Sequence, residues 1–460
     1  MNNKTLHLLK KINTVNTTPI CGRVSQAIGL VVEGHADISA VGEVCEITPK
    51  GPESPILAEV VGFRENKILM MPLGELNGIG PGSAIHSSGS RATAAVGQGL
   101  LGRVIDGLGF PLDGHGPLNT QELYPLYAPP PNPLERRRIS HSLDLGIRAI
   151  NSLFTCGRGQ RMGIFAGSGV GKSVLLGMIS RYTEADVNVI ALIGERGREV
   201  KEFIEKDLGE EGLKHSVVIV ASSEKAPLIR QRGAFLAMTI AEYFRDQGKQ
   251  VLLMMDSLTR LAHAQREIGL AIGEPPTTKG YTPSVFAMLP RFLERAGTAS
   301  NDGTITGLYT VLVEGDDLND PIPDAARSIL DGHIVLSREI AARNQYPAID
   351  ILNSTSRVMI DIVDPQHLRN AKKLTDMTAS YQSAEDLIHI GAYKSGSNAK
   401  IDESIERRDD IQSYLRQDIH EKADLNESLL DLRGLFDGPQ QNQKGIVAVS
   451  RQPRGRHNAS

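Results

Sequence analysis

A glycine-rich segment in the first half of the chain has the residue types and spacing that hold the phosphates of a nucleotide. An apolar run over residues 162–165 precedes it, and a helix-like run over residues 174–179 follows it. Glycines let backbone N–H groups converge on an anion, and the start of a helix adds unpaired donors and a favourable dipole. The segment therefore predicts a phosphate-binding loop. Its residues are Ala166, Gly167, Ser168, Gly169, Val170, Gly171, Lys172 and Ser173.

The last two residues of this loop predict the ligand chemistry. Lys172 can bridge the β- and γ-phosphates of ATP, and the Ser173 hydroxyl can ligate Mg²⁺. The first position departs from the usual pattern, because Ala166 stands where a glycine is expected. Alanine is acceptable there only if the backbone needs no positive φ. The alternative, a glycine-rich turn that happens to precede a lysine, leaves the flanking strand and helix unexplained.

Two carboxylates follow other apolar runs. Asp256 ends the run over residues 251–255, and Glu195 comes directly after the run over residues 190–193. Because the carboxyl ends of parallel strands meet at one edge of a sheet, we expect both side chains to lie near Lys172. Asp256 would then orient Mg²⁺, and Glu195 would polarise an attacking water. A helix-capping aspartate and a surface ion pair are the alternatives for these two residues.

The elements that must position these side chains change character along the chain. Short apolar runs cut by glycine and proline over residues 21–96 predict a small antiparallel barrel or sandwich. A proline-rich connector follows over residues 106–133. From about residue 143 to residue 363, apolar strands alternate with helix-length segments, which predicts a parallel sheet covered by helices on both faces. The strand candidates are residues 161–166, 187–193, 217–221, 251–255, 305–313 and 333–336.

The two ends of the chain differ in composition from the segments between them. Residues 364–436 are charged and predict a helical region, whereas residues 437–460 are rich in Gln, Asn, Gly and Arg and predict a disordered tail. The first 20 residues are weakly amphipathic. A short docking helix and a frayed terminus both remain open for them, because isolated helices of this length are marginal in water.

The bulk composition excludes some classes of protein. The net charge is −4, which carries no electrostatic signature of a nucleic-acid-binding protein. The 3 cysteines have neither zinc-site nor disulfide-framework spacing, which is typical of a reducing compartment. No apolar run approaches the roughly 20 residues of a membrane-spanning helix. We therefore expect a cytoplasmic protein, with contact at a membrane surface left open.

Several further segments resemble the catalytic subunits of the rotary ATP synthases. Residues 194–199 resemble the GER-x-RE motif, residues 346–350 the YPA-x-D motif, and residues 354–357 the S-x-SR motif of that superfamily. A stretch from Pro321 to Arg338 is also similar. The resemblance runs from about residue 20 to about residue 395.

Within this superfamily, residues 256–260 and 271–286 resemble the ATPases of type III protein export. The phosphate loop together with residues 264–271 is most similar to the flagellum-specific members. The resemblance implies a RecA-like P-loop core with a parallel sheet, preceded by a small β-barrel and followed by a helical domain. The expected division is an N-terminal segment 1–20, a barrel 21–96, an ATPase domain 97–378, a helical domain 379–436 and a tail 437–460.

The resemblance also implies roles for individual residues. Lys172 would hold phosphate, Glu195 would be the general base, and Arg196 would contact the γ-phosphate region. Arg357 would be an arginine finger that reaches into the nucleotide site of a neighbouring subunit, with a surface arginine as the alternative. Tyr346 would stack on adenine, with a plain core tyrosine as the alternative.

The function implied is ATP hydrolysis by a homohexameric ring that energises unfolding, chaperone release and export of flagellar proteins. The implied partners are a stator-like regulator at residues 1–20, export chaperone–substrate complexes and a membrane export gate, with no nucleic acid. The protein would associate peripherally with the inner membrane. The alternatives are a virulence-type secretion ATPase, a rotary ATP synthase catalytic subunit, a Rho-type nucleic-acid translocase and a non-catalytic ring subunit.

Overall fold

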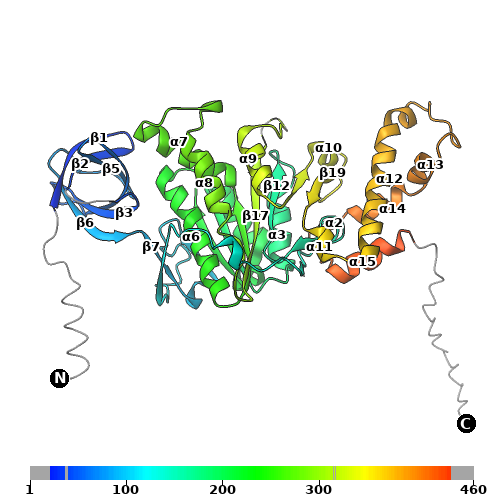
Figure 1. Ribbon diagram of the computed structural model, residues 1–460, viewed down its shortest axis with the longest axis horizontal. Coiled ribbons are helices and arrows are strands. Elements are labelled where there is room, and N and C mark those ends of the chain that lie inside the picture. The colour runs from blue at the N-terminus through cyan, green and yellow to red at the C-terminus, as the bar shows by residue number, and fades with distance from the viewer. Residues whose placement is uncertain (1–20, 37–39, 314, 316, 437–460) are drawn as a thin grey trace, which may run out of the picture.

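The computed structural model describes residues 21–36, 40–313, 315 and 317–436. A β-barrel, a helix-covered sheet and a helical region follow one another along the long axis of the molecule (Figure 1). This arrangement confirms the predicted fold class. The predictions for residues 1–20 and 437–460 lie outside the described residues, and the proposed domain boundaries stay predictions.

The first part is a closed antiparallel barrel and not a sandwich. Its strand order is β1-β2-β5-β4-β3-β6. Alternating apolar residues such as Val32, Ile47, Val60 and Ile85 fill the interior. Closure leaves no free strand edge, which a small sheet of this size would otherwise expose. The strands are β1 Cys21–Ile28, β2 Val31–His35, β3 Glu43–Thr48, β4 Ile56–Arg64, β5 Lys67–Pro72 and β6 Ala84–Arg91.

The connector after the barrel joins it to the central sheet. Strand β7, Thr93–Val96, pairs with β9, Glu122–Pro125. Beyond β9, the Tyr127 hydroxyl donates a 2.7 Å hydrogen bond to Glu59 of the barrel, and Arg232 of the core ion-pairs with the same carboxylate. Burial raises the pKa of Glu59, while Arg232 opposes that shift. A buried, fully paired carboxylate thus links the barrel, the connector and the core.

The central sheet has nine strands, and all six predicted strands occur in it within one residue of their expected ends. Its order is β19-β18-β12-β17-β15-β13-β14-β8, with β16 paired to β17; β19 and β16 run antiparallel to their neighbours. The edge strands β8 and β19 were not among the predicted ones. The strands are β8 Arg103–Asp106, β12 Arg161–Ala166, β13 Val187–Ile193, β14 Ser216–Ala221, β15 Gln250–Asp256, β16 Gly297–Thr298, β17 Thr304–Leu312, β18 Gly332–Leu336 and β19 Ile349–Ser356. A separate short ribbon pairs β10 Ser142–Leu143 with β11 Cys156–Gly157.

Helices cover both faces of this sheet, as a buried parallel sheet requires. Along β13, Val189 and Ala191 pack into one core with residues of α6, α7 and α8, whereas Ile190 and Leu192 pack into a second core with α2 and α3. The helices of this part are α2 Arg148–Leu153, α3 Lys172–Tyr182, α4 Gly197–Glu202, α5 Gly209–Lys214, α6 Pro227–Asp246, α7 Leu258–Ile272, α8 Pro283–Leu293 and α9 Pro321–Ile329. A π-helical turn, Phe203–Leu208, lies between α4 and α5.

The last part is helical and begins at a well-capped helix. Asp364 accepts hydrogen bonds from the N–H groups of Gln366 and His367, and Pro365 takes the first helical position of α12. Helix α12 runs unbroken past residue 378, and the helices after it lie beside it (Figure 1). Two short helices of the core, α10 Arg338–Ala342 and α11 Met359–Ile362, come before it. The helices of the last part are α12 Pro365–His389, α13 Ala399–Glu406, α14 Arg408–Leu415 and α15 Leu425–Gly434.

Candidate nucleotide site

The phosphate loop connects the end of β12 to the start of α3. Ala166 is the last residue of β12, so its backbone is extended and alanine causes no strain there. Gly169 and Gly171 have φ values of 79° and 89°, which side-chain-bearing residues rarely adopt. Gly171 is the N-cap of α3 and supplies no side-chain cap. The donors of the first helical turn are therefore available to an anion, which fits a phosphate group.

A cluster of buried charges lies directly beside the loop. The Lys172 ammonium ion-pairs with Asp256 and lies 3.5 Å from Glu195 Oε1. The side chains of the three residues are only 13%, 6% and 13% exposed. Thr310 of β17, the strand between β12 and β15, donates a 2.7 Å hydrogen bond from its hydroxyl to Asp256 Oδ1. The carboxyl ends of four strands thus position one cation and two carboxylates.

The protonation of this cluster is shifted by burial and by neighbouring charges. Burial raises the pKa of Glu195, the negative charge of Asp256 raises it further, and the result is about 7. A hydrogen bond between Glu195 and Glu199 lowers the pKa of Glu199. Burial acts to lower the pKa of Lys172, but the two carboxylates outweigh it, and that pKa is raised. Lys172 therefore remains charged, whereas Glu195 is poised to exchange a proton near neutral pH.

Arg260 is a second cation, packed against Gly194, the residue before Glu195, and sequence reasoning did not single it out as a site residue. Gly194, with a φ of 72°, lies so close that a Cβ on it would be 2.9 Å from Cβ of Arg260. The Nε of Arg260 is buried and has no hydrogen-bond partner among the described residues. A buried donor without a partner is costly, so an anionic ligand at this place would complete its hydrogen bonding.

The other end of the site is an apolar cavity of about 370 Å³. The ring of Tyr346 closes one side, 3.6 Å from where a Cβ on Gly171 would stand. Cavities of this size and lining suit a flat aromatic group. The lining residues are Val170, Gly171, Val174, Leu175, Met178, Leu336, Tyr346, Pro347, Ala348, Gln417, Asp418 and Ile419.

Residues 417–419 of this wall come from the helical region, and sequence reasoning missed them. The Gln417 N–H donates a 2.9 Å hydrogen bond to the Tyr346 carbonyl. Its side-chain amide accepts from the N–H of Arg148 at 2.8 Å and donates to the carbonyl of Gly146 at 2.8 Å. Gln417 is buried, and its segment is separated from the phosphate loop by more than 240 residues, so no local pattern indicates the contact.

Two predicted residues lie away from the charge cluster within the single chain. Arg196 is the N-cap of α4, and its side chain is 82% exposed and pairs with Glu199 at 3.4 Å. Arg357 follows β19, which runs antiparallel to β18, so it lies where the parallel strands begin and not at their carboxyl ends, where the phosphate loop lies. Its N–H donates to the carbonyl of Asp331, which ion-pairs with Arg161, the first residue of β12. The length of β12, about 16 Å at 3.3 Å per residue, separates that edge from the phosphate loop.

The residues predicted to hold a metal are few. Ser173 is exposed at the first turn of α3, and Asp256 is buried against Lys172, the residue before Ser173. Within the described part of the chain, no group of three or more His, Cys, Asp or Glu side chains could hold a metal ion. One or two protein ligands completed by water and substrate phosphate is how Mg²⁺ is usually bound, so these residues fit Mg²⁺ bound together with a nucleotide.

The fold and this site together define a P-loop ATPase. Residues 146–356 match the nucleotide-binding domain of the ATP synthase alpha/beta family, and residues 24–89 match the β-barrel domain of the same family. Residues 363–434 match the C-terminal domain of the type III secretion system EscN ATPase.

Curated relatives narrow the class further. The chain is 53% identical over 439 residues to the flagellum-specific ATP synthase of Bacillus subtilis, covering 94% of this chain and 99% of the relative. It is 52% identical to the flagellum-specific ATP synthase of Salmonella typhimurium, covering 90% and 93%. It is 51% identical to the type 3 secretion system ATPase of Xanthomonas euvesicatoria, covering 86% and 89%. The chain belongs to the family of flagellum-specific and type III secretion ATPases.

Solved structures agree with this assignment. The assembled ATPase EscN of the enteropathogenic E. coli type III secretion system superposes with a TM-score of 0.85 at 45% identity, covering 90% of this chain and 99% of that one. EscN in complex with its central stalk EscO gives a TM-score of 0.83 at 44% identity, with the same coverage. Among the described residues, no helix has the length and apolarity to cross a membrane.

Proposed function

We propose that this chain hydrolyses Mg²⁺-ATP as a homohexameric ring and that the energy released drives export of flagellar proteins through a type III export gate. The observation that carries the catalytic part is the buried cluster of Lys172, Glu195 and Asp256 at the end of the phosphate loop. In this proposal the loop residues 166–173 bind the phosphates, and Tyr346 stacks on adenine. When bound, Mg²⁺ would neutralise phosphate charge from a position held by Ser173 and Asp256.

Glu195 is the general base of the proposed reaction. Its pKa of about 7 lets it accept a proton from water and release it again at the pH of the cell. Lys172 keeps its charge at this pH and pairs with β- and γ-phosphate oxygens. Asp256 stays fixed by Thr310, so the carboxylate does not need to reorganise during the reaction. Arg260, packed against Gly194, supplies a further cation, and the exposed Arg196 contacts the γ-phosphate region in this proposal.

Arg357 acts in trans in this proposal. The edge of the sheet that carries it is separated from the same chain's phosphate loop by about 16 Å of strand, which an arginine side chain cannot span. A neighbouring subunit placed head to tail would bring its own Arg357 edge against this site. Such head-to-tail contacts form a closed ring when the rotation from one subunit to the next is a whole fraction of a full turn.

A dilution series tests the ring. Specific ATPase activity should rise steeply with protein concentration, because an isolated subunit lacks its neighbour's arginine. Size-exclusion chromatography with light scattering at the same concentrations should show the rise coinciding with assembly. A specific activity that stays flat while the oligomer dissociates would overturn the trans assignment.

Mixing two inactive variants tests the same point more directly. Lys172→Ala removes the phosphate-binding cation, and Arg357→Ala removes the finger. Rings that contain both variants include interfaces with an intact Lys172 on one side and an intact Arg357 on the other, so activity should partly return. If both residues served the same subunit's site, every mixture would stay inactive.

The export role rests on the names of the relatives, several of which are flagellum-specific ATP synthases. The regulator proposed for residues 1–20, the chaperone–substrate complexes and the export gate belong to this part of the proposal, as does a peripheral place at the inner membrane. EscN is solved with a central stalk, and a comparable stalk protein is proposed here. Loss of motility on deletion of the gene, restored by the wild-type chain but not by Glu195→Gln, would support the flagellar role. Loss of secretion of virulence proteins, with motility unchanged, would instead indicate a virulence-type secretion ATPase.

A further inference from the structure

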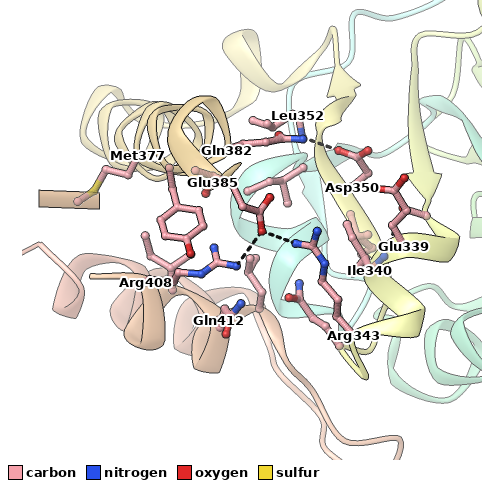
Figure 2. A pocket seen from close by; sticks show the side chains of 18 of the residues that line it. Glu339, Ile340, Arg343, Asp350, Leu352, Met377, Gln382, Glu385, Arg408 and Gln412 are labelled. Carbon is pink, nitrogen blue, oxygen red and sulfur yellow. Dashed lines mark hydrogen bonds and ion pairs between the residues drawn. The ribbon is translucent and has the colours of Figure 1, made fainter. Parts of the chain in front are cut away.

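A second cavity, of about 170 Å³, lies where the core meets the helical region. Residues of α10 and β19 line one side, and residues of α12, α13 and α14 line the other (Figure 2). The Glu385 carboxylate of α12 points across this space. It accepts a 2.8 Å hydrogen bond from Arg343, just after α10, and lies 3.8 Å from Arg408 of α14.

Contacts within the helical region hold Glu385 in place. Its side chain is only 16% exposed, and Arg408 stacks its guanidinium 3.6 Å from the centre of the Tyr381 ring. This stacking fixes the cation, which in turn fixes the carboxylate. Arg343, on the core side, is 56% exposed and is the more exposed partner. The ion pair therefore links a fixed group of the helical region to the end of a short helix of the core.

The segment that follows Arg343 leads directly to the nucleotide site. Tyr346 comes three residues later and lines the apolar cavity described above. The same segment has a second tie to the helical region, because the Gln417 N–H donates to the Tyr346 carbonyl. The segment is thus attached to the helical region at two points, at Arg343 to α12 and at Tyr346 to the loop after α14.

We infer that Glu385 is a positioning residue for nucleotide binding: by holding Arg343 it sets where Tyr346 stands, and so makes nucleotide affinity depend on the position of the helical region. Glu385 itself touches no part of the site. The inference rests on the proposed stacking of Tyr346 on the adenine of the nucleotide. It follows that a partner which moves α12 would change nucleotide affinity through this contact.

The test is the affinity of the full chain for a fluorescent ADP analogue, with steady-state KM and kcat for ATP. Glu385→Gln should raise the dissociation constant and KM about two- to fivefold, with kcat changed less, since partly exposed ion pairs are modest in strength. Arg343→Ala should have the same effect, and the double variant should show no further loss. Glu403→Gln is the matched control, because Glu403 pairs with Lys373 at 3.2 Å between α12 and α13, away from residues 343–348.

Tyr346→Ala distinguishes a failure of the proposed role of Tyr346 from a failure of the proposed role of Glu385. If it leaves affinity unchanged, the proposed role of Tyr346 fails and the inference fails with it. If Tyr346→Ala weakens binding but Glu385→Gln behaves like Glu403→Gln, only the inference is overturned. A lower unfolding temperature of Glu385→Gln with unchanged nucleotide affinity would assign Glu385 a structural role alone and would also overturn it.

Discussion

The phosphate end of the nucleotide site gathers charged side chains at the ends of neighbouring strands, whereas the base end is completed by two loops, around Tyr346 and Ile419, that lie against α3 and are far apart in the chain. At the phosphate end, Lys172 at the start of α3, Glu195 just after β13 and Asp256 at the end of β15 are buried at one edge of the sheet. At the base end, Tyr346 and Ile419 are 43% and 44% exposed and belong to loops. The buried end suits the chemical step, which needs fixed charges, and the more exposed end suits control of affinity.

The comparison predicts that changes at the phosphate end reduce kcat, with the largest effect at Glu195. Glu195→Gln keeps the size of the side chain but removes the base, and kcat should fall about 10²- to 10⁴-fold. Nucleotide affinity should change little, as measured with a fluorescent analogue. Glu202→Gln is the control, because Glu202 pairs with Arg198 on the exposed face of α4. A Glu195→Gln variant with near-normal kcat would remove Glu195 from the chemistry.

The second prediction is a pH dependence that belongs to the phosphate end alone. Burial, reinforced by Asp256, raises the pKa of Glu195 to about 7, and only its ionised form accepts a proton. Below pH 7 kcat/KM should therefore fall about tenfold per pH unit, and above pH 7 it should level off. The residual activity of Glu195→Gln should lack this acid limb. An acid limb that persists in the variant would assign the titration to another group.

A smaller loss is expected when Asp256 is released from its hydrogen bond. Thr310→Val keeps the shape of the side chain but removes the donor, and kcat/KM should fall about tenfold, since bonds to charged groups contribute about 1.5–3 kcal/mol. Thr304→Val is the control on the same strand, because its hydroxyl bonds Gln250 at the other end of β17. Equal effects of the two variants would indicate a loss of sheet stability and not of Asp256 positioning.

The smallest effect is expected at the base end. Ile419→Ala shortens one wall of the apolar cavity, so KM for ATP should rise a few-fold while kcat stays near normal, the pattern of a lost uniform binding contact. Leu430→Ala, at an exposed position of α15, should leave both constants unchanged. If kcat of Ile419→Ala fell as much as that of Thr310→Val, the base end would also affect the chemical step, and the proposed difference between the two ends would be wrong.

Local patterns predicted the strands and the phosphate loop because their signals are short. The run over residues 161–166 and the glycines after it lie in one continuous segment, and the structure has β12 at the same bounds. Strand alternation with helices was enough to predict a parallel sheet, which in turn places Glu195 and Asp256 at one edge. The edge strand β19 was less evident, because its sequence includes Asn353, Ser354 and Thr355 and lacks a continuous apolar run.

By itself, the sequence determined which residues could do chemistry and on which strand ends they stand, since residue type and short-range periodicity are local properties. Only the tertiary structure decided that Thr310 supports Asp256, that Gln417 and Ile419 wall the base cavity, and that Arg357 lies at the far edge from its own phosphate loop. These relations depend on strand order and on the return of the chain after α14, and both follow from how buried surfaces fit together over hundreds of residues.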